Sequence, residues 1–413
     1  MVALLLATAD ARLFGRSLSS PAPESTTSTH PDTATTATLC PASGEAHWRH
    51  DVLHARDLAS ENASSVFDVS PSSHSFSSSS SLFNVSHWTS RLGNNFVQIS
   101  NGLVLAACCR GTVEFPAHAS WPKLARRVSY AHPSFPVTFR PNASLSRCST
   151  AFEADLLYGW SAYAYAYTLP IDTEEALFQC DFDLHAALLA VTLDEAPGCT
   201  AACAGERSFG DNVLTIHVRS GDIFAHAPGE MGYDDGMGGY AQYPAAFYAA
   251  VLSHRVWHRV IFITDPGSKD EKKGLNPVFS HFQKPEVLGS WPHTAFEFRD
   301  NGTLAEDTGA LRCATHLVAA HSSFSYYAMA TSRALKSYYV PRGAQCMAYT
   351  GRCDAMPPGA KLVAVALPGW DLSATWRNTA EERERMVAYA LAPSNDTFAV
   401  YDELPHPGRW PDW

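Results

Sequence analysis

The 413-residue sequence lacks the short glycine-rich motifs that bind phosphate in common nucleotide-binding folds, because it contains neither Gly-x-Gly-x-x-Gly nor Gly-Lys-Ser/Thr. It also lacks a nucleophile elbow, and its 18 histidines show no zinc-site spacing. Basic residues are outnumbered, with 30 Lys and Arg against 41 Asp and Glu and a net charge of -11. These features disfavour a dinucleotide or ATP fold, a sulfotransferase, a hydrolase and a nucleic-acid surface, and they leave phosphate binding to a few placed cations.

The sequence has little that resembles a membrane span. Residues Met1 to Ala7 are mostly apolar but too short to cross a bilayer, and no other run is long enough. Serine, threonine and proline dominate the stretch from about Ser17 to Ser86, which has too little apolar surface to offset chain entropy. We expect residues 1–86 to hold a signal or anchor remnant and a disordered stem; an ordinary disordered leader is the alternative.

Cysteines and glycosylation sequons indicate passage through the secretory pathway. The ten cysteines form an even set, and Cys199 with Cys203 and Cys346 with Cys353 are close enough in the chain to be local bridges. Cys108 and Cys109 end an apolar helix-like run and can be interpreted as simple core residues. The five sequons begin at Asn62, Asn84, Asn142, Asn301 and Asn395.

The most informative stretch is an apolar run, Val213 to Val218, followed by polar residues that complete His-x-Arg-x-Gly-Asp. The run predicts a buried parallel strand, so the polar residues fall at the carboxyl end of that strand, where open α/β sheets bind ligands. The guanidinium of Arg219 matches a pair of phosphates, Gly221 permits a sharp turn, and Asp222 can hold the arginine in place. A structural ion pair at a strand end is the alternative interpretation.

Strands and helices alternate from residue 213 to residue 341, which predicts a doubly wound parallel sheet. The strands after the first are expected at 260–264, 295–298, 317–320 and 337–341. Asp265 follows the second strand, and Ser322 and Ser323 follow the fourth, so these groups should converge with His217 and Arg219 on one crevice. Taken alone, the two serines are equally well explained as helix caps, and each aspartate as a turn or helix-start residue.

The hexad His217 to Asp222 resembles motif I of the fucosyltransferase superfamily, which includes the α1,2-, α1,6- and protein O-fucosyltransferases. Two further stretches extend the resemblance. One is Gly93-Asn94-Asn95-Phe96-Val97-Gln98, and the other runs from Glu306-Asp307 to Ser322-Ser323-Phe324. Ser220 departs from the family, because α1,2 and α1,6 members commonly carry a second arginine there, and this leaves the donor sugar open.

The resemblance implies an α/β fold of the GT-B type, with two Rossmann-like lobes and a cleft between them. It implies an acceptor-side domain at residues 87–205, a nucleotide-sugar-binding domain at 206–345 and an extension at 346–413 with a terminal helix. That helix is predicted to begin at a capping box formed by Thr379 and Glu382.

The resemblance also implies roles for particular residues, with Arg219 on the diphosphate of GDP-fucose. The catalytic candidates are His217, Arg219, Asp222 and, as a base, Glu230, although the neighbouring acids Asp234 and Asp235 are open alternatives. The donor-binding candidates are Arg219, Asp265, Asp307, Ser322, Ser323 and Phe324. The acceptor-side candidates are Asn94, Asn95 and Gln98, of which Asn94 is favoured as a helix cap.

The predicted function is therefore that of a metal-independent fucosyltransferase in the Golgi lumen, with no cofactor beyond GDP-fucose as donor and a glycan or glycoprotein as acceptor. No nucleic acid is expected as a partner, and a membrane only through an N-terminal anchor. A glycosyltransferase using another nucleotide sugar and a non-catalytic carbohydrate-binding protein are the alternatives. The triplet Asp181-Phe182-Asp183 is a weak rival sign of a metal-dependent glycosyltransferase.

Overall fold

A computed structural model describes the parts of the chain on which the fold and site depend. The described residues are 82–85, 88, 92–118, 124–131, 137–139, 180–181, 183–192, 210–225, 241–265, 274–343, 355–392, 394 and 396–401.

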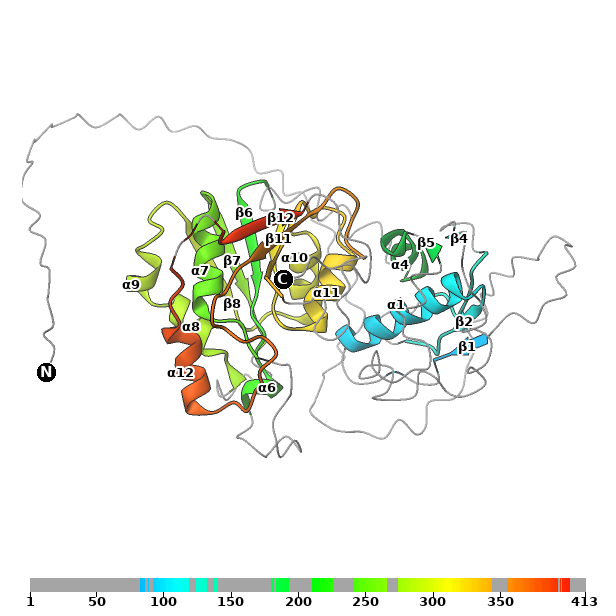
Figure 1. Ribbon diagram of the computed structural model, residues 1–413, viewed down its shortest axis with the longest axis horizontal. Coiled ribbons are helices and arrows are strands. Elements are labelled where there is room, and N and C mark those ends of the chain that lie inside the picture. Colours follow the sequence, from blue (N-terminus) through cyan, green and yellow to red (C-terminus); the bar gives the residue numbers. More distant parts are fainter. Residues whose placement is uncertain are drawn as a thin grey trace, which may run out of the picture. The chain divides into compact units, whose positions relative to one another are not determined.

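Within these residues the largest sheet has seven strands in the order β12-β11-β10-β9-β6-β7-β8 (Figure 1). Its strands are β6 (Val213–His217), β7 (Arg259–Ile263), β8 (Ala295–Arg299), β9 (His316–Val318), β10 (Ser337–Pro341), β11 (Lys361–Val365) and β12 (Phe398–Tyr401). All neighbouring strands are parallel except β12, which is antiparallel to β11. All five residues of β6 are buried, as expected for a strand covered on both faces. The α/β class is confirmed.

Helices cover both faces of this sheet (Figure 1). Alternate residues of β6 enter different hydrophobic clusters, because successive side chains of a strand point to opposite faces. Leu214 and Ile216 pack with α7 (Ala245–His254), α8 (Pro277–Phe282) and Met386 of α12 (Ala380–Ala388). The opposite face packs with α10 (Leu304–Arg312) and α11 (Ser323–Ala330).

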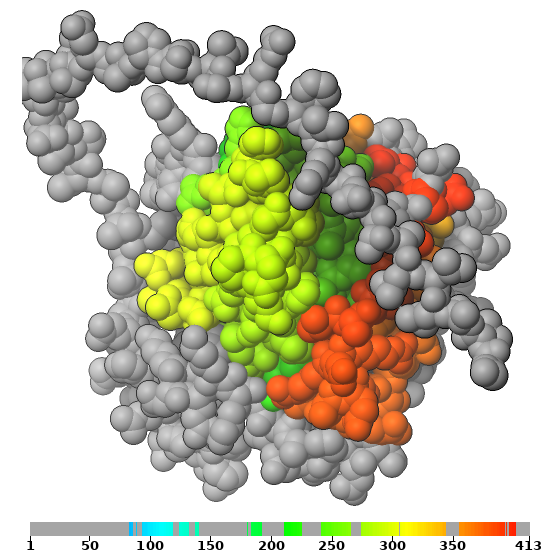
Figure 2. Space-filling view, turned by 90° about the vertical axis from the view of Figure 1, so that its left-hand side faces the viewer, coloured from blue at the N-terminus to red at the C-terminus, as the bar shows by residue number. Residues whose placement is uncertain are grey.

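Two further helices are short: α6 (Asp222–Ala225) directly follows β6, and α9 (Pro285–Leu288) follows α8. In the space-filling view of Figure 2, the yellow-green residues that include α8 and α9 lie beside the orange residues that include α12. The predicted capping box of α12 is confirmed, since Thr379 and Glu382 each bond the other's backbone N–H. Because β11 and β12 continue the sheet, the boundary expected at residue 345 falls between two neighbouring strands.

The described N-terminal residues form two helices and two small sheets. The helices are α1 (Leu92–Cys108) and α4 (Leu184–Thr192). The strands are β1 (Leu82–Asn84), β2 (Thr112–Glu114), β3 (Arg127–Ser129), β4 (Thr138–Phe139) and β5 (Cys180–Asp181), in the orders β1-β2-β3 and β4-β5. The predicted disordered stem extends too far, because β1 lies within it: Phe83 is fully buried there and the strand pairs with β2.

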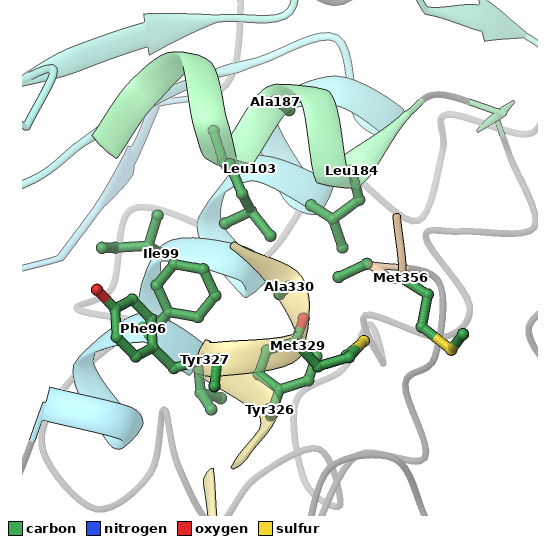
Figure 3. Packing of buried hydrophobic residues seen from close by; sticks show 14 of the residues in the cluster. Phe96, Ile99, Leu103, Leu184, Ala187, Tyr326, Tyr327, Met329, Ala330 and Met356 are labelled. Atoms are coloured by element: carbon green, nitrogen blue, oxygen red, sulfur yellow. The ribbon is translucent and has the colours of Figure 1, made fainter. Parts of the chain in front are cut away.

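Helix α1 packs directly on α11, so the N-terminal elements share one hydrophobic cluster with the sheet's α10 and α11 face. Figure 3 shows Phe96 and Ile99 of α1 beside α11, and the Phe96 ring centroid lies 4.9 Å from that of Tyr327 and 5.9 Å from that of Tyr326. This shared cluster fixes the start of α1 next to the start of α11.

The interpretation of Cys108 and Cys109 as simple core residues is wrong. Both are buried, but Cys108 is bonded to Cys180, and Cys109 is also in a disulfide. The bond links the end of α1 to β5, just before α4. The expected bridges Cys199–Cys203 and Cys346–Cys353 lie outside the described residues.

Candidate functional site

The candidate site lies where the order of the sheet strands reverses. From β6 the chain moves outward to β7 and β8, and then it returns to the other side of β6 to form β9, β10 and β11. The helices after β6 and β9 therefore depart toward opposite faces, and the carboxyl ends of these two strands form the topological switch point of the sheet. Open α/β sheets bind their ligands at such a switch point.

The carboxyl end of β6 carries the predicted cation. Arg219 Nη2 donates a hydrogen bond to Asp222 Oδ1, the first residue of α6. The side chain of Arg219 is 19% exposed and that of Asp222 is 35% exposed, so the pair faces partly toward solvent. Gly221 has a φ of +78°, a conformation that residues with a side chain rarely adopt, and it makes the turn that brings Asp222 back to Arg219.

A buried hydrogen-bond network supports the main chain beneath Arg219. The Ser220 and Thr264 hydroxyl oxygens are 2.6 Å apart, and Ser220 Oγ accepts a hydrogen bond from Asn276 N at 3.0 Å. Asn276 Nδ2 donates to the carbonyl oxygen of Arg219 at 2.9 Å, while its Oδ1 caps α8 by accepting from Val278 N. The loop after β7 and the loop before α8 are thereby tied to the bend, and they hold the main chain of Arg219 in place.

The carboxyl end of β9 contributes the two predicted serines. Ser322 is the N-cap of α11, and its Oγ accepts from Phe324 N at 3.2 Å. Ser323 Oγ donates to Asn94 Oδ1 at 2.5 Å, which joins α11 to α1. Capping thus accounts for Ser322 by itself, and the first turn of α11, which holds no acidic residue, still presents the positive end of a helix dipole beside β6.

The start of α1 approaches the start of α11 very closely. A Cβ built on Gly93 would lie 2.6 Å from Phe324 N and 2.7 Å from Ser323 C, so no larger residue fits there without a shift. The positive ends of two helix dipoles meet at this point, although Phe324 N and Ser325 N already donate to Ser322. The local environment favours an anion.

The predicted acceptor-side residues are placed differently from expectation. Asn94 lies in the first turn of α1 and bonds Ser323, so its interpretation as the helix cap is wrong. Asn95 is 5% exposed and bonds His118 Nε2 at 3.0 Å, and Gln98 is fully buried. Asn95 and Gln98 therefore face the protein interior, and only Asn94 of the three borders the candidate site.

Two histidines beside Arg219 are held neutral. Burial and the nearby Arg219 charge lower the pKa of His217 to about 3. Burial lowers the pKa of His321 to about 4, with the same arginine contributing; its Nδ1 lies 3.0 Å from Ala241 O, and its ring stacks on Tyr243. Neither ring adds charge at neutral pH, so Arg219 supplies the cationic charge between these strand ends.

The two predicted aspartates border the carboxyl ends of β7 and β8. Asp265 is exposed just after β7. Asp307, in the first turn of α10, is 6% exposed, and its Oδ1 is buried without a hydrogen-bond partner in the described part of the chain. Burial raises the pKa of Asp307 to about 7, against the lowering effect of Arg299, and the charges of Asp265 and Glu306 act in the same direction as burial. Asp307 is thus a buried carboxyl that titrates near neutral pH.

Several candidates lie outside the site or outside the described residues. Glu230, Asp234 and Asp235 are not among the described residues. Asp183 of the Asp-x-Asp triplet accepts a hydrogen bond from Ala186 N at 2.9 Å at the start of α4, which is a capping contact. Among the described residues no group of three His, Cys, Asp or Glu side chains is arranged to hold a metal ion, and no helix there is long and apolar enough to span a bilayer.

Sequence reasoning missed four residues that shape the site: Gly93, Thr264, Asn276 and Ser325. Thr264 and Ser325 adjoin predicted features, at the end of an expected strand and next to the expected serine pair. Asn276 precedes Pro277, a pattern typical of a helix start, but its bond to Arg219 joins residues 57 positions apart. Local patterns carry no information about such a contact.

Fold and site together define an α/β protein with a partly buried arginine and two helix starts at a topological switch point. No protein-family model matches this chain, and searches of the curated proteins and of the solved structures also find no match.

Proposed function

We propose that this protein is a glycosyltransferase that binds the diphosphate of a nucleotide sugar at the carboxyl ends of β6 and β9. The observation that carries the proposal is the position of Arg219, whose guanidinium lies at the switch point with its main chain held by Ser220 and Asn276. A planar guanidinium matches two phosphoryl oxygens, and helix starts nearby favour the same anion.

The proposed donor is GDP-fucose, and the proposed acceptor is a hydroxyl of a glycan or glycoprotein. The resemblance of His217 to Asp222, and of the later motifs, to fucosyltransferases supports this choice. Arg219 would stabilise the charge on the departing diphosphate without a metal ion, and Asp265 and Asp307 border the place where a ribose or base would lie. Glu230 stays a candidate for the base that deprotonates the acceptor.

A GT-B arrangement in the lumen of the Golgi belongs to the same proposal. The seven-stranded sheet is suited to the donor lobe, and α1, whose start reaches Ser323, would come from the acceptor side. The Cys108–Cys180 disulfide supports folding in an oxidising compartment.

Transfer from a different nucleotide sugar is the second candidate, and Ser220 favours keeping it. The family's second arginine would occupy a position that is 2% exposed here and hydrogen-bonded to two neighbouring loops. The site therefore has one guanidinium from this motif where α1,2 and α1,6 members have two, and that difference bears on donor choice.

The test is a panel of GDP, GDP-fucose, UDP and UDP-sugars in a thermal-shift assay with a metal chelator present. We expect GDP and GDP-fucose to raise the melting temperature, and Arg219→Ala to weaken binding at least about a hundredfold. Arg259→Ala is the matched control, because Arg259 also pairs with a carboxylate, Glu297, but at the amino end of β7. A response to UDP alone would favour the second candidate. Glycan binding with no response to any nucleotide would refute the transferase proposal and indicate a carbohydrate-binding protein.

A further inference from the structure

One hydrogen bond beside the candidate site fixes which nitrogen of His217 carries the proton. His217 Nδ1 lies 2.6 Å from the hydroxyl oxygen of Ser325, a residue in the first turn of α11. Phe324 packs its ring edge-on against the His217 ring, with centroids 5.5 Å apart. The imidazole is thus held from two sides by α11.

The direction of that bond follows from the other contacts of Ser325. Its Oγ accepts a hydrogen bond from Ala320 N at 2.9 Å, and its side chain is fully buried. Within the described structure Ser325 Oγ has no polar neighbour at bonding distance apart from Ala320 N and His217 Nδ1. The hydroxyl proton can therefore be satisfied only by donation to Nδ1, and the opposite arrangement would leave it buried without an acceptor.

An imidazole whose Nδ1 accepts a hydrogen bond carries its proton on Nε2 when neutral. His217 is neutral over the physiological range, since burial and Arg219 lower its pKa to about 3. The residue as a whole is 6% exposed, and no hydrogen bond to Nε2 is formed among the described residues. A fixed donor thus remains available next to Arg219.

We propose that Ser325 is a positioning residue that holds His217 in the Nε2–H tautomer, so that His217 donates a hydrogen bond to an oxygen of the nucleoside diphosphate beside Arg219. This inference rests on the proposed function for the identity of the ligand, but the tautomer itself does not depend on it. It changes the role expected for His217, because a ring whose only free nitrogen already carries a proton is a hydrogen-bond donor and cannot act as the acceptor's base.

The experiment is a two-dimensional proton–nitrogen spectrum of the histidine rings in the ¹⁵N-labelled full chain, with the His217 signals identified by their loss in His217→Gln. The variants are Ser325→Ala and the matched control Ser332→Ala. Ser332 is also fully buried near the end of α11, and its hydroxyl donates to Arg312 O at 2.8 Å. The same samples are then titrated with GDP.

We expect the ligand-free wild type and Ser332→Ala to show the signature of a proton on Nε2, unchanged between pH 5 and pH 8, and Ser325→Ala to lose it. GDP should shift the Nε2 resonance, and Ser325→Ala should bind GDP about tenfold more weakly than Ser332→Ala. A wild-type spectrum with the proton on Nδ1 would overturn the role assigned to Ser325, and this result does not require the variant to fold. A Ser325→Ala spectrum like that of the wild type would overturn it as well.

The GDP arm separates this inference from the proposed function. If GDP binds and the His217 Nε2 resonance does not move, the donor role is wrong although the transferase proposal stands. If GDP does not bind while the tautomer signature is present and depends on Ser325, the proposed function fails and the positioning role of Ser325 is supported.

Discussion

His217 and His316 are two buried histidines on neighbouring strands of one sheet, and their surroundings differ completely. His217 ends β6, bonds Ser325 and lies near Arg219. His316 begins β9 at the opposite end of the strands, and its ring packs edge-on against Trp257. In the described structure its nitrogens make no hydrogen bond of normal geometry, although the Asp211 backbone is close enough to raise its pKa slightly against the effect of burial. Burial lowers the pKa of both, to about 3 and about 4, so the pKa alone does not distinguish a candidate ligand-binding residue from a core residue.

The amino ends and the carboxyl ends of the sheet strands differ in the same way. At the amino ends Lys336 pairs with Asp211, and both side chains are more than half exposed, so that pair contributes little to stability. At the carboxyl ends, hydrogen bonds of Ser220, Thr264 and Asn276 hold the main chain that carries the Arg219–Asp222 pair. Backbone hydrogen bonds join neighbouring strands at their amino ends too, as from His258 N to Asn212 O. Among the described residues, buried hydrogen bonds made by side chains join one strand end to the next only at the carboxyl ends. Connectivity, more than residue type, identifies the candidate site.

The largest loss of stability at the carboxyl ends is expected from Ser220→Arg. This substitution introduces the second arginine that α1,2 and α1,6 members of the resembled family commonly carry. Ser220 is 2% exposed and bonded to two loops, so an arginine there would break the network and bury a charge. We expect a loss of about 4 kcal/mol or more of unfolding free energy. Urea unfolding followed by circular dichroism measures it.

Ser253→Arg is the control for this substitution. Ser253 is exposed near the end of α7, and its change should stay within about 0.5 kcal/mol. Equal stability of Ser220→Arg and the wild type would mean that the bend beneath Arg219 can accommodate a large side chain. The hydrogen bonds of Ser220 would then not distinguish the carboxyl ends of the strands from their amino ends.

The next effect compares two aspartates whose pKa values move in opposite directions. Asp307 has its pKa raised to about 7 by burial, whereas the Lys336 hydrogen bond lowers that of Asp211. In the unfolded chain Asp307 ionises near pH 4, while in the folded chain it keeps its proton to about pH 7. Folding stability is therefore lost as pH rises from about 4 to 7, and Asp307→Asn removes this loss.

We expect Asp307→Asn to match the wild type near pH 4 and to be about 2 to 4 kcal/mol more stable at pH 8. Asp211→Asn should show the opposite sign, since its ion pair stabilises the fold above about pH 4 and is lost on acidification. The measurement is urea unfolding at a series of pH values. A stability difference for Asp307→Asn that stays constant with pH would show that this carboxyl titrates normally.

The sequence predicts the sheet better than it predicts the site. Every strand expected between residues 213 and 341 is present, because buried parallel strands are short apolar runs bounded by turn residues. The capping box at Thr379 is also confirmed, since it depends on neighbouring residues. Interactions between residues close together in the sequence are enough to form these elements.

The site depends on contacts that no local pattern encodes. The sequence favours Asn94 as a cap, but packing of α1 on α11 places it inside the helix and against Ser323, 229 positions away. Gln98, which the resemblance implies on the acceptor side, is fully buried in the same helix. His217 illustrates the limit most clearly: its place at a strand end was predictable, whereas its tautomer is set by a serine 108 positions later.

The smallest effect comes from replacing each of the two buried histidines by phenylalanine. In His316→Phe no side-chain hydrogen bond of normal geometry is lost, only a contact with the Asp211 backbone, and a ring still packs on Trp257. The stability should therefore change little. In His217→Phe the Ser325 hydroxyl loses its only acceptor, and the cost should be about 1 to 2 kcal/mol. Chemical denaturation of the two variants side by side, at pH 7, measures the difference. Both rings are buried and of similar size. A larger loss of unfolding free energy for His316→Phe than for His217→Phe would therefore show that polar contacts also hold the amino ends of the strands, and the distinction between the two ends would fail.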